Sequence, residues 1–184
     1  EHEVHINVSL IEMINRWEVK IMSKPKSVIK KSIDSISTDL IELSKKIHAN
    51  PELCFKEFKA ANWLQEIVKG HGFTVEAPCG NMETAFKARF KGKQKGPRVA
   101  FLAEYDALRG KGHACGHNII AACAAGAAIG LSKVMDNLGG EVILLGTPAE
   151  EGGGGKIILL DEGEFDDIDY ALMIHPGSRN LIGR

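Results

Sequence analysis

The apolar residues in the first third of the chain recur at helical spacing. Between residues 26 and 49 they are Val28, Ile29, Ile33, Ile36, Leu40, Ile41, Leu43 and Ile47. This spacing predicts an amphipathic helix over residues 26–49, which Asn50-Pro51 ends. A second helix is expected over residues 57–69, with Gly70 placed to end it, and a short strand over residues 73–76.

The rest of the chain alternates between apolar strands and one long helix. Residues 84–90 and 98–103 read as two strands, and the basic, glycine-containing turn between them favours a hairpin. The later elements are an Ala-rich helix over 117–137 ended by Gly139-Gly140, a continuous apolar strand over 141–146, a helix beginning at 156–160, and a buried strand over 170–174.

This order of strands and helices predicts one α/β domain. Right-handed crossovers would give a three-layer α/β/α sandwich with a mainly parallel sheet, covered by helices on both faces. The 184 residues, 44% of them hydrophobic, suffice for one sizeable core. We expect the domain to span residues 26–184. Residues 1–25 are expected to be an irregular or non-native extension, with Met22 as a possible natural start.

The charge balance limits the possible binding partners, and the cysteine pattern indicates the cellular compartment. The 23 basic and 24 acidic residues give a net charge of -1, which offers no general attraction to nucleic acid or to an anionic membrane. The longest apolar stretch, residues 119–131, is too short to span a bilayer. Four cysteines without a CxxC pair favour a reducing compartment, so we expect a cytoplasmic protein.

Polar clusters follow three strands of the expected sheet, after Ala103, Gly146 and Ile174. Ligands of such sheets gather beyond the carboxyl ends of the strands. Cys115 and His117 flank Gly116, which allows a tight turn, so both side chains can face one cation. The alternative is a buried free cysteine beside a helix-capping histidine. His175, at the end of another strand, favours the metal site.

Glu150 and Glu151 follow the strand at 141–146 and precede four glycines. Adjacent carboxylates on an extended backbone point in different directions, so one can bind metal while the other takes a proton. The alternative is a solvated acidic loop. A phosphate-binding loop is excluded, because that motif requires glycine at position 150 and Ser or Thr at position 157, which are Glu150 and Ile157 here.

Asp106 and His113 could lie near the site, and the remaining histidines and cysteines are expected to lie outside it. Asp106 follows the strand at 98–103 and is suited to orient a ligand imidazole by a hydrogen bond. His113 is either a contact to substrate or to a ligand residue, or a plain loop residue. The residues expected to lie outside the site, on the surface, at helix ends or in packing positions, are His2, His5, His48, His71, Cys54, Cys79 and Cys123.

Several motifs, in order, resemble the amidohydrolase branch of the co-catalytic metallopeptidases, metallopeptidase family 20. This group contains aminoacylases, hippurate hydrolase, aminobenzoyl-glutamate hydrolase, plant auxin-conjugate hydrolases and Xaa-Arg dipeptidase. The motifs are HANPEL at 48–53, EYDAL at 104–108, GHACGHN at 112–118, PAEEGGGG at 148–155 and ALMIHP at 171–176. The EYDAL form and Asn118 are most similar to the dipeptidase and aminobenzoyl-glutamate hydrolase subgroup.

The resemblance implies a zinc-peptidase (phosphorylase/hydrolase-like) fold and assigns roles to single residues. It implies that Cys115, His117, Glu151 and His175 bind two divalent metal ions, zinc or manganese. Glu150 would be the general base that deprotonates the attacking water and then protonates the leaving amine. The implied substrates are dipeptides or N-acyl amino acids.

Two features depart from the family pattern. Arg109 stands where the family usually has proline. Family members are about twice as long, with a lid and dimerisation domain and a further histidine ligand, so we expect only the N-terminal part of the catalytic domain here, with the complete form a homodimer. The alternative is a truncated, inactive fragment that at most binds a partner.

Overall fold

The computed structural model describes residues 24–177, and its first part is helical as expected. Residues 24–35 are helical, Ile36 interrupts the helix, and α2 (Ser37–His48) continues it. The second helix is α3 (Phe58–Gly70), which includes the glycine expected to end it. The expected extension at residues 1–25 lies almost wholly outside the described residues.

The described residues form a sheet of five strands in the order β1-β2-β4-β3-β5. The strands β3 and β4 are parallel, as are β3 and β5, whereas β1–β2 and β2–β4 are antiparallel. The expected α/β sheet is therefore present, in mixed form: its parallel half carries the strands whose ends were predicted to form the site. The strands are β1 (Thr74–Glu76), β2 (Phe86–Lys91), β3 (Arg98–Ala103), β4 (Glu141–Gly146) and β5 (Tyr170–Leu172).

The predicted hairpin between β2 and β3 is wrong, because β4 lies between these two strands and pairs with both. Every residue of β4 is buried. A strand that is apolar on both faces gains most from a central place, where helices cover both of its sides. The loop after β2 wraps around the start of β4 instead: Gly140 N donates to Gln94 O and Glu141 N donates to Pro97 O.

The second half of the chain contains shorter elements than the pattern predicted. The Ala-rich helix is divided into α4 (His117–Ser132) and α5 (Met135–Leu138), and α6 (Glu150–Gly153) and α7 (Gly155–Asp161) follow β4. The last strand, β5, ends at Leu172 and is exposed, so the expected buried strand over 170–174 is wrong. It is an edge strand of the described sheet. None of the described helices combines the length and apolarity of a membrane span.

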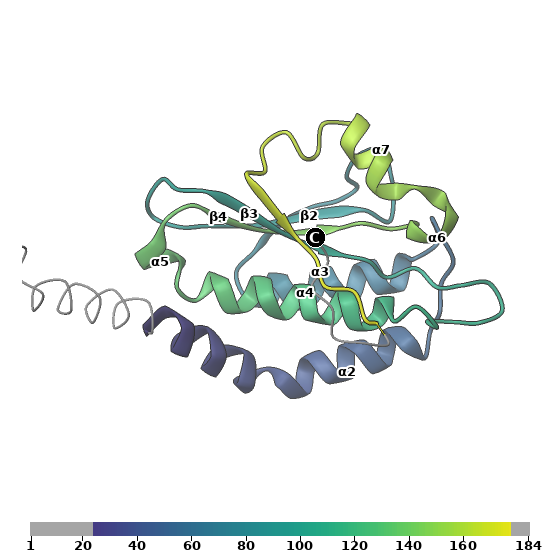
Figure 1. The fold of residues 1–184 in the computed structure, drawn as a ribbon, viewed down its shortest axis with the longest axis horizontal. Helices are drawn as coiled ribbons and strands as arrows, with labels where there is room; N and C mark the ends of the chain where they lie inside the picture. The colour runs from purple at the N-terminus through teal and green to yellow at the C-terminus, as the bar shows by residue number, and fades with distance from the viewer. Residues whose placement is uncertain (1–23, 178–184) are drawn as a thin grey trace, which may run out of the picture.

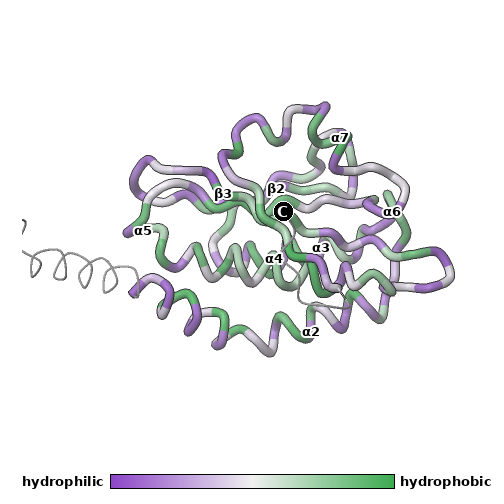
Figure 2. Tube along the Cα trace, viewed as in Figure 1, coloured by the Kyte–Doolittle hydropathy of each residue, from purple (hydrophilic) through white to green (hydrophobic). Residues whose placement is uncertain are grey.

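Helices cover both faces of the sheet, as Figure 1 shows. The helices α2, α3 and α4 lie on one face and α7 lies on the other. Alternate residues of β4 serve the two cores: Val142 and Leu144 belong to the larger cluster under α3 and α4, whereas Ile143 and Leu145 pack with Leu159 of α7. In Figure 2 the hydrophobic residues follow the central strands and α4, and the connecting loops are mostly hydrophilic.

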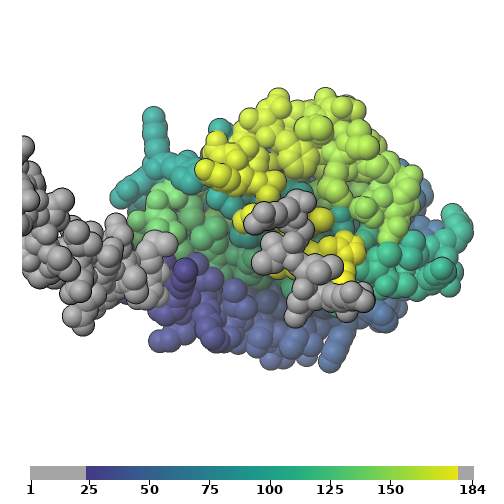
Figure 3. All heavy atoms as spheres, in the orientation of Figure 1, coloured from purple at the N-terminus to yellow at the C-terminus, as the bar shows by residue number. Residues whose placement is uncertain are grey.

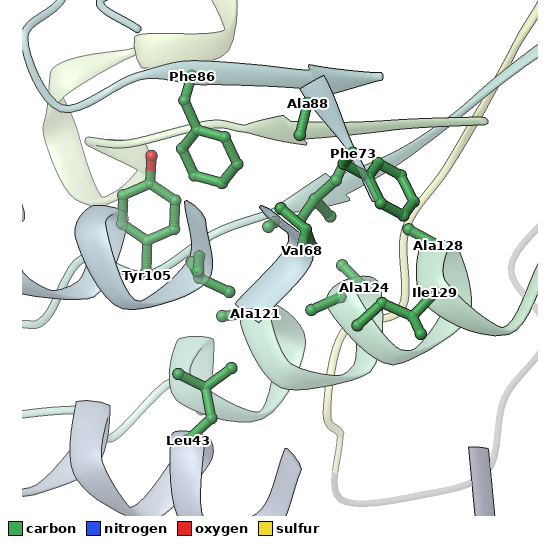
Figure 4. Close-up of a cluster of buried hydrophobic side chains, with 14 of the residues drawn as sticks. Leu43, Val68, Phe73, Phe86, Ala88, Tyr105, Ala121, Ala124, Ala128 and Ile129 are labelled. Atoms are coloured by element: carbon green, nitrogen blue, oxygen red, sulfur yellow. The ribbon is translucent and has the colours of Figure 1, made fainter. Parts of the chain in front are cut away.

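The larger core extends up to the site. Tyr105 is fully buried against Phe86, with ring centroids 6.2 Å apart, and its hydroxyl donates to Thr84 O at 2.6 Å. Figure 4 shows both rings at one end of a cluster that continues through Ala121 and Ala124 to Ile129. This packing fixes the backbone just after β3. The segment after β5, in yellow in Figure 3, lies on the surface between α7 and the helical layer.

Candidate metal centre

The predicted site residues meet where β3 and β4 end and α4 and α6 begin, to the right in Figure 1. Asp106 comes from the loop after β3, and Glu150 and Glu151 begin α6 after β4. His117 is the first residue of α4, and His175 follows β5. The structure therefore brings together the side chains that the strand-end argument selected.

Gly116 places Cys115 and His117 on the same side of a turn. Its φ of 80° is a left-handed conformation, which costs glycine little, and it is the residue before the first turn of α4. A Cβ at this position would lie 2.9 Å from Cγ of Pro176. The turn thus also lets the segment after β5 approach closely. As a result, Cys115, His117 and Glu151 each offer a donor atom within 4.8 Å of the others.

Asp106 holds His117 and the acidic loop at the same time. Its Oδ1 lies 2.9 Å from Nδ1 of His117, and its Oδ2 accepts the backbone N–H of Glu151 at 2.8 Å. Burial by itself would raise the pKa of Asp106, but the hydrogen bonds from His117 and from the backbone lower it below its usual value. When Nδ1–H donates to this carboxylate, Nε2 of His117 presents its lone pair to the site.

Three carboxylates surround this second nitrogen of His117. Its Nε2 lies 3.4 Å from Oε2 of Glu104, 3.8 Å from Oε2 of Glu150 and 3.8 Å from Oε1 of Glu151. The nitrogen is buried and has no hydrogen-bond partner among the described residues. The His175 ring approaches edge-on, with centroids 5.8 Å apart. A nitrogen lone pair amid carboxylate oxygens is an arrangement that fits a bound cation.

Cys115 and the two adjacent glutamates differ in their contacts. The hydrogen bond with Glu151, with burial as a smaller cause, raises the pKa of the Cys115 thiol to about 11. Glu151 is 24% exposed and Glu150 is 40% exposed. Residues 150–153 form an irregular turn rather than the extended segment from which different directions were expected, and both carboxylates lie 3.8 Å from Nε2 of His117. The hydrogen bond with the Cys115 thiol nonetheless distinguishes Glu151 from Glu150.

The glycines after Glu151 make this turn possible. Gly152 has a φ of 94° and Gly154 a φ of 65°. Gly155 is packed so closely that a Cβ would lie 1.9 Å from Pro148 O. Gly152 and Gly154 therefore serve the backbone conformation of the loop, whereas Gly155 serves its close packing. Lys156, which follows them, contacts the Glu104 carboxylate.

A buried glutamate that the sequence reasoning missed, Glu57, holds the backbone that leads into the loop of Glu150 and Glu151. Glu57 has no exposed surface; its Oε1 accepts the backbone N–H groups of Phe55 at 3.0 Å and Ala149 at 2.9 Å, and its Oε2 accepts the Thr84 hydroxyl at 2.9 Å. Phe55 and Ala149 both have positive φ. Burial raises the pKa of Glu57. No local signal marks this residue, since two of its three partners, Thr84 and Ala149, lie 27 and 92 positions away in the sequence.

The other histidines fall outside the cluster around His117. His113 is buried, so it is no plain exposed loop residue; burial lowers its pKa, and its ring lies 6.3 Å from the ring of exposed His48. His71 directly follows α3, at the predicted helix end. His2 and His5 lie outside the described residues. Cys54, Cys79 and Cys123 are free thiols that belong to neither possible metal-binding group among the described residues.

Comparison with known sequences shows a match to a peptidase family and to peptidases and amide hydrolases. Residues 96–183 match the model of peptidase family M20/M25/M40. The chain is 40% identical over 165 residues to Xaa-Arg dipeptidase of Mus musculus, covering 80% of this chain and 37% of that protein. It is 39% identical over 165 residues to a subunit of p-aminobenzoyl-glutamate hydrolase of Escherichia coli (strain K12), covering 78% and 34%. The chain thus spans less than half the length of these relatives.

Solved structures share the fold. The Bacillus subtilis YXEP protein, a dinuclear metal binding peptidase from the M20 family, superimposes with a TM-score of 0.69 at 26% identity, covering 75% of this chain and 42% of that one. A putative aminohydrolase from methicillin resistant Staphylococcus aureus gives a TM-score of 0.70 at 28% identity, covering 79% and 41%. Sequence and fold together show that this chain belongs to the amidohydrolase branch of peptidase family M20/M25/M40.

Proposed function

We propose that the protein containing this chain hydrolyses an amide bond of dipeptides or N-acyl amino acids, using two divalent metal ions. The observation that carries the proposal is the buried Nε2 of His117, which has no hydrogen-bond partner among the described residues and lies within 3.8 Å of three carboxylates. The named relatives, a dipeptidase and an aminobenzoyl-glutamate hydrolase, support the substrate class.

Cys115, His117, Glu151 and His175 would hold the ions. One nitrogen of His117 is used by Asp106, so the other can serve only one ion. The thiolate of Cys115 and the imidazoles suit zinc, whereas a carboxylate-rich set also suits manganese. A bound divalent ion would supply a more acidic water and would polarise the amide carbonyl of the substrate.

Glu150 is suited to the proton transfers of this reaction. Its carboxylate reaches the site, with Oε2 3.8 Å from Nε2 of His117, and is more exposed than that of Glu151. In the proposed reaction, Glu150 takes a proton from the attacking water and delivers it to the leaving amine. Asp106 keeps His117 in the tautomer that presents Nε2 to the site.

The four free cysteines support the further proposal of a cytoplasmic, reducing location.

Hydrolysis assays on the complete protein that carries this chain test the proposal. The panel pairs dipeptides, including peptides ending in arginine, with N-acyl amino acids, including aminobenzoyl-glutamate. We expect turnover of at least one class, its loss after chelation, and its return with zinc or manganese. A metal-loaded protein that cleaves no member of the panel would contradict the proposed activity.

A further inference from the structure

Glu104 and Lys156 form an ion pair beside the candidate centre that the proposed reaction does not use. Glu104 follows β3 and is 1% exposed, and Lys156 lies in the first turn of α7 with a side chain that is 32% exposed. Their contact joins Nζ of Lys156 to Oε1 of Glu104. The Oε1 atom of Glu104 is therefore paired with the ammonium group of Lys156, which comes from α7 on the face of the sheet opposite α4.

The other oxygen of Glu104 has no such partner. Oε2 is buried and makes no hydrogen bond within the described part of the chain. It faces Nε2 of His117, which is also buried and also makes no hydrogen bond there. The two atoms are 3.4 Å apart. With Nδ1–H of His117 given to Asp106, both facing atoms are acceptors. Two buried acceptors directed at each other are unfavourable unless a cation or a proton lies between them.

The separation matches two donors of one metal ion. Zinc binds imidazole nitrogen and carboxylate oxygen at about 2.0–2.2 Å, so two such donors in a tetrahedral shell are ~3.4 Å apart. Glu104, His117 and His175 each offer one donor atom within 4.8 Å of the others. Three donors of this kind are the protein share of a metal site with an open position.

We propose that Glu104 is a further carboxylate ligand of the ion held by His117 and His175, and that Lys156 positions it. Because Lys156 holds Oε1, only Oε2 is free to turn toward the ion, which makes the carboxylate a monodentate donor. The ammonium group also compensates part of the negative charge collected by Glu104, Glu150 and Glu151. This inference rests on the proposed metal centre and adds a ligand to it.

Glu104→Gln tests the role of the carboxylate, because the amide keeps the shape and a polar contact to Lys156 but loses the anionic donor. The readouts are the affinity for zinc, measured in competition with a chelator, and the absorption spectrum of the cobalt-loaded protein, which reports coordination. We expect affinity for one ion to fall about 10–100-fold, with a changed cobalt spectrum. The matched control, Glu83→Gln, changes an exposed glutamate away from the site and should change neither.

The double variant Glu104→Gln/Lys156→Gln separates a ligand from a simple counter-ion. If Glu104 only neutralises Lys156, removing both charges relieves the defect and restores zinc affinity, which would overturn the inference. If Glu104 is a ligand that Lys156 positions, the double variant stays weak, and Lys156→Gln alone lowers zinc affinity by less than Glu104→Gln does. Zinc binding by Glu104→Gln equal to that of the parent would also overturn the inference. A parent protein that binds neither zinc nor manganese would instead contradict the proposed function itself.

Discussion

The Oε1 atom of Glu57 lies 2.9 Å from the backbone nitrogen of Ala149, across 92 positions of sequence. Ala149 has a φ of 59° and directly precedes Glu150 and Glu151. Such a left-handed residue persists only when its surroundings hold it. The same carboxylate also binds Phe55, another left-handed residue, so one buried acid fixes two strained turns beneath the candidate centre.

Removal of this acid should loosen the loop that carries both glutamates. Glu57→Ala leaves the buried N–H of Ala149 and the part-buried N–H of Phe55 without an acceptor, and a buried group of this kind costs about 1–3 kcal/mol. We expect the free energy of unfolding to fall by about 3 kcal/mol, measured by urea denaturation, and zinc affinity to fall with it. Glu83→Ala, a change to an exposed glutamate one residue before Thr84, is the control. Equal stability of the two variants would contradict the role of Glu57.

The glycines of the acidic loop should differ sharply in their tolerance of a methyl group. At Gly155 a Cβ would meet Pro148 O at 1.9 Å, so Gly155→Ala requires backbone movement and is expected to cost about 3 kcal/mol and to weaken zinc binding. At Gly152 no atom lies within 4 Å, and only its φ of 94° opposes alanine, at about 1 kcal/mol. Thermal unfolding of both variants measures the difference. A reversed order would refute the packing argument.

Glu150 should be needed for turnover and not for metal. Glu150→Ala is expected to retain zinc while the hydrolytic rate falls at least 100-fold, because general-base catalysis contributes about 10²–10⁴-fold. Cys115→Ala, in contrast, should lose zinc as well as activity. Metal analysis and kinetics on the same preparations check both statements. Normal turnover by Glu150→Ala would rule out Glu150 as the base.

A second ion-pair network, outside the site, should make stability depend on pH. Lys87, 4% exposed, lies 2.5 Å from Glu164. Burial would raise the pKa of Glu164, but the bonds from Lys87 and Cys79 lower it below 4.5. Stabilisation by this group is therefore complete above about pH 4.5 and is lost as the pH falls through the lower folded-state pKa.

Glu164→Gln should accordingly destabilise the protein by about 1–3 kcal/mol at pH 7, and by less as the pH falls below 4.5. Urea unfolding at a series of pH values measures this. The neighbouring exposed Glu162→Gln serves as the control and should have little effect at any pH. A Glu164→Gln effect that stays constant down to pH 3 would be inconsistent with the lowered pKa.

The alternation of strands and helices was predictable because each element has its own period of apolar residues. The same pattern located the site, since Asp106, Glu150 and His175 each follow a strand. The pairing of β2 with β3 was predicted wrongly, because two neighbouring strands have the same local pattern whether or not a third strand later inserts between them. Only the full burial of β4 indicates which strand takes the centre.

The supporting residues were not predictable in the same way. Glu57 and Ala149, and likewise Glu104 and Lys156, come together only through the folded sheet and loops, 92 and 52 positions apart. Glu104 had the same signal as Asp106, an acidic residue at the end of an apolar strand. What distinguishes it is an unpartnered oxygen aimed at His117, which only the folded structure reveals.

The most direct test of the metal centre is zinc K-edge X-ray absorption on the zinc-loaded protein. The account predicts one sulfur ligand at about 2.3 Å among nitrogen and oxygen ligands at about 2.0–2.2 Å, with the sulfur signal lost in Cys115→Ser. Cys123→Ser, a change to an exposed cysteine on the same α4 helix that begins at His117, should leave it unchanged. A spectrum with only nitrogen and oxygen neighbours, or one unaffected by Cys115→Ser, would contradict the proposed centre.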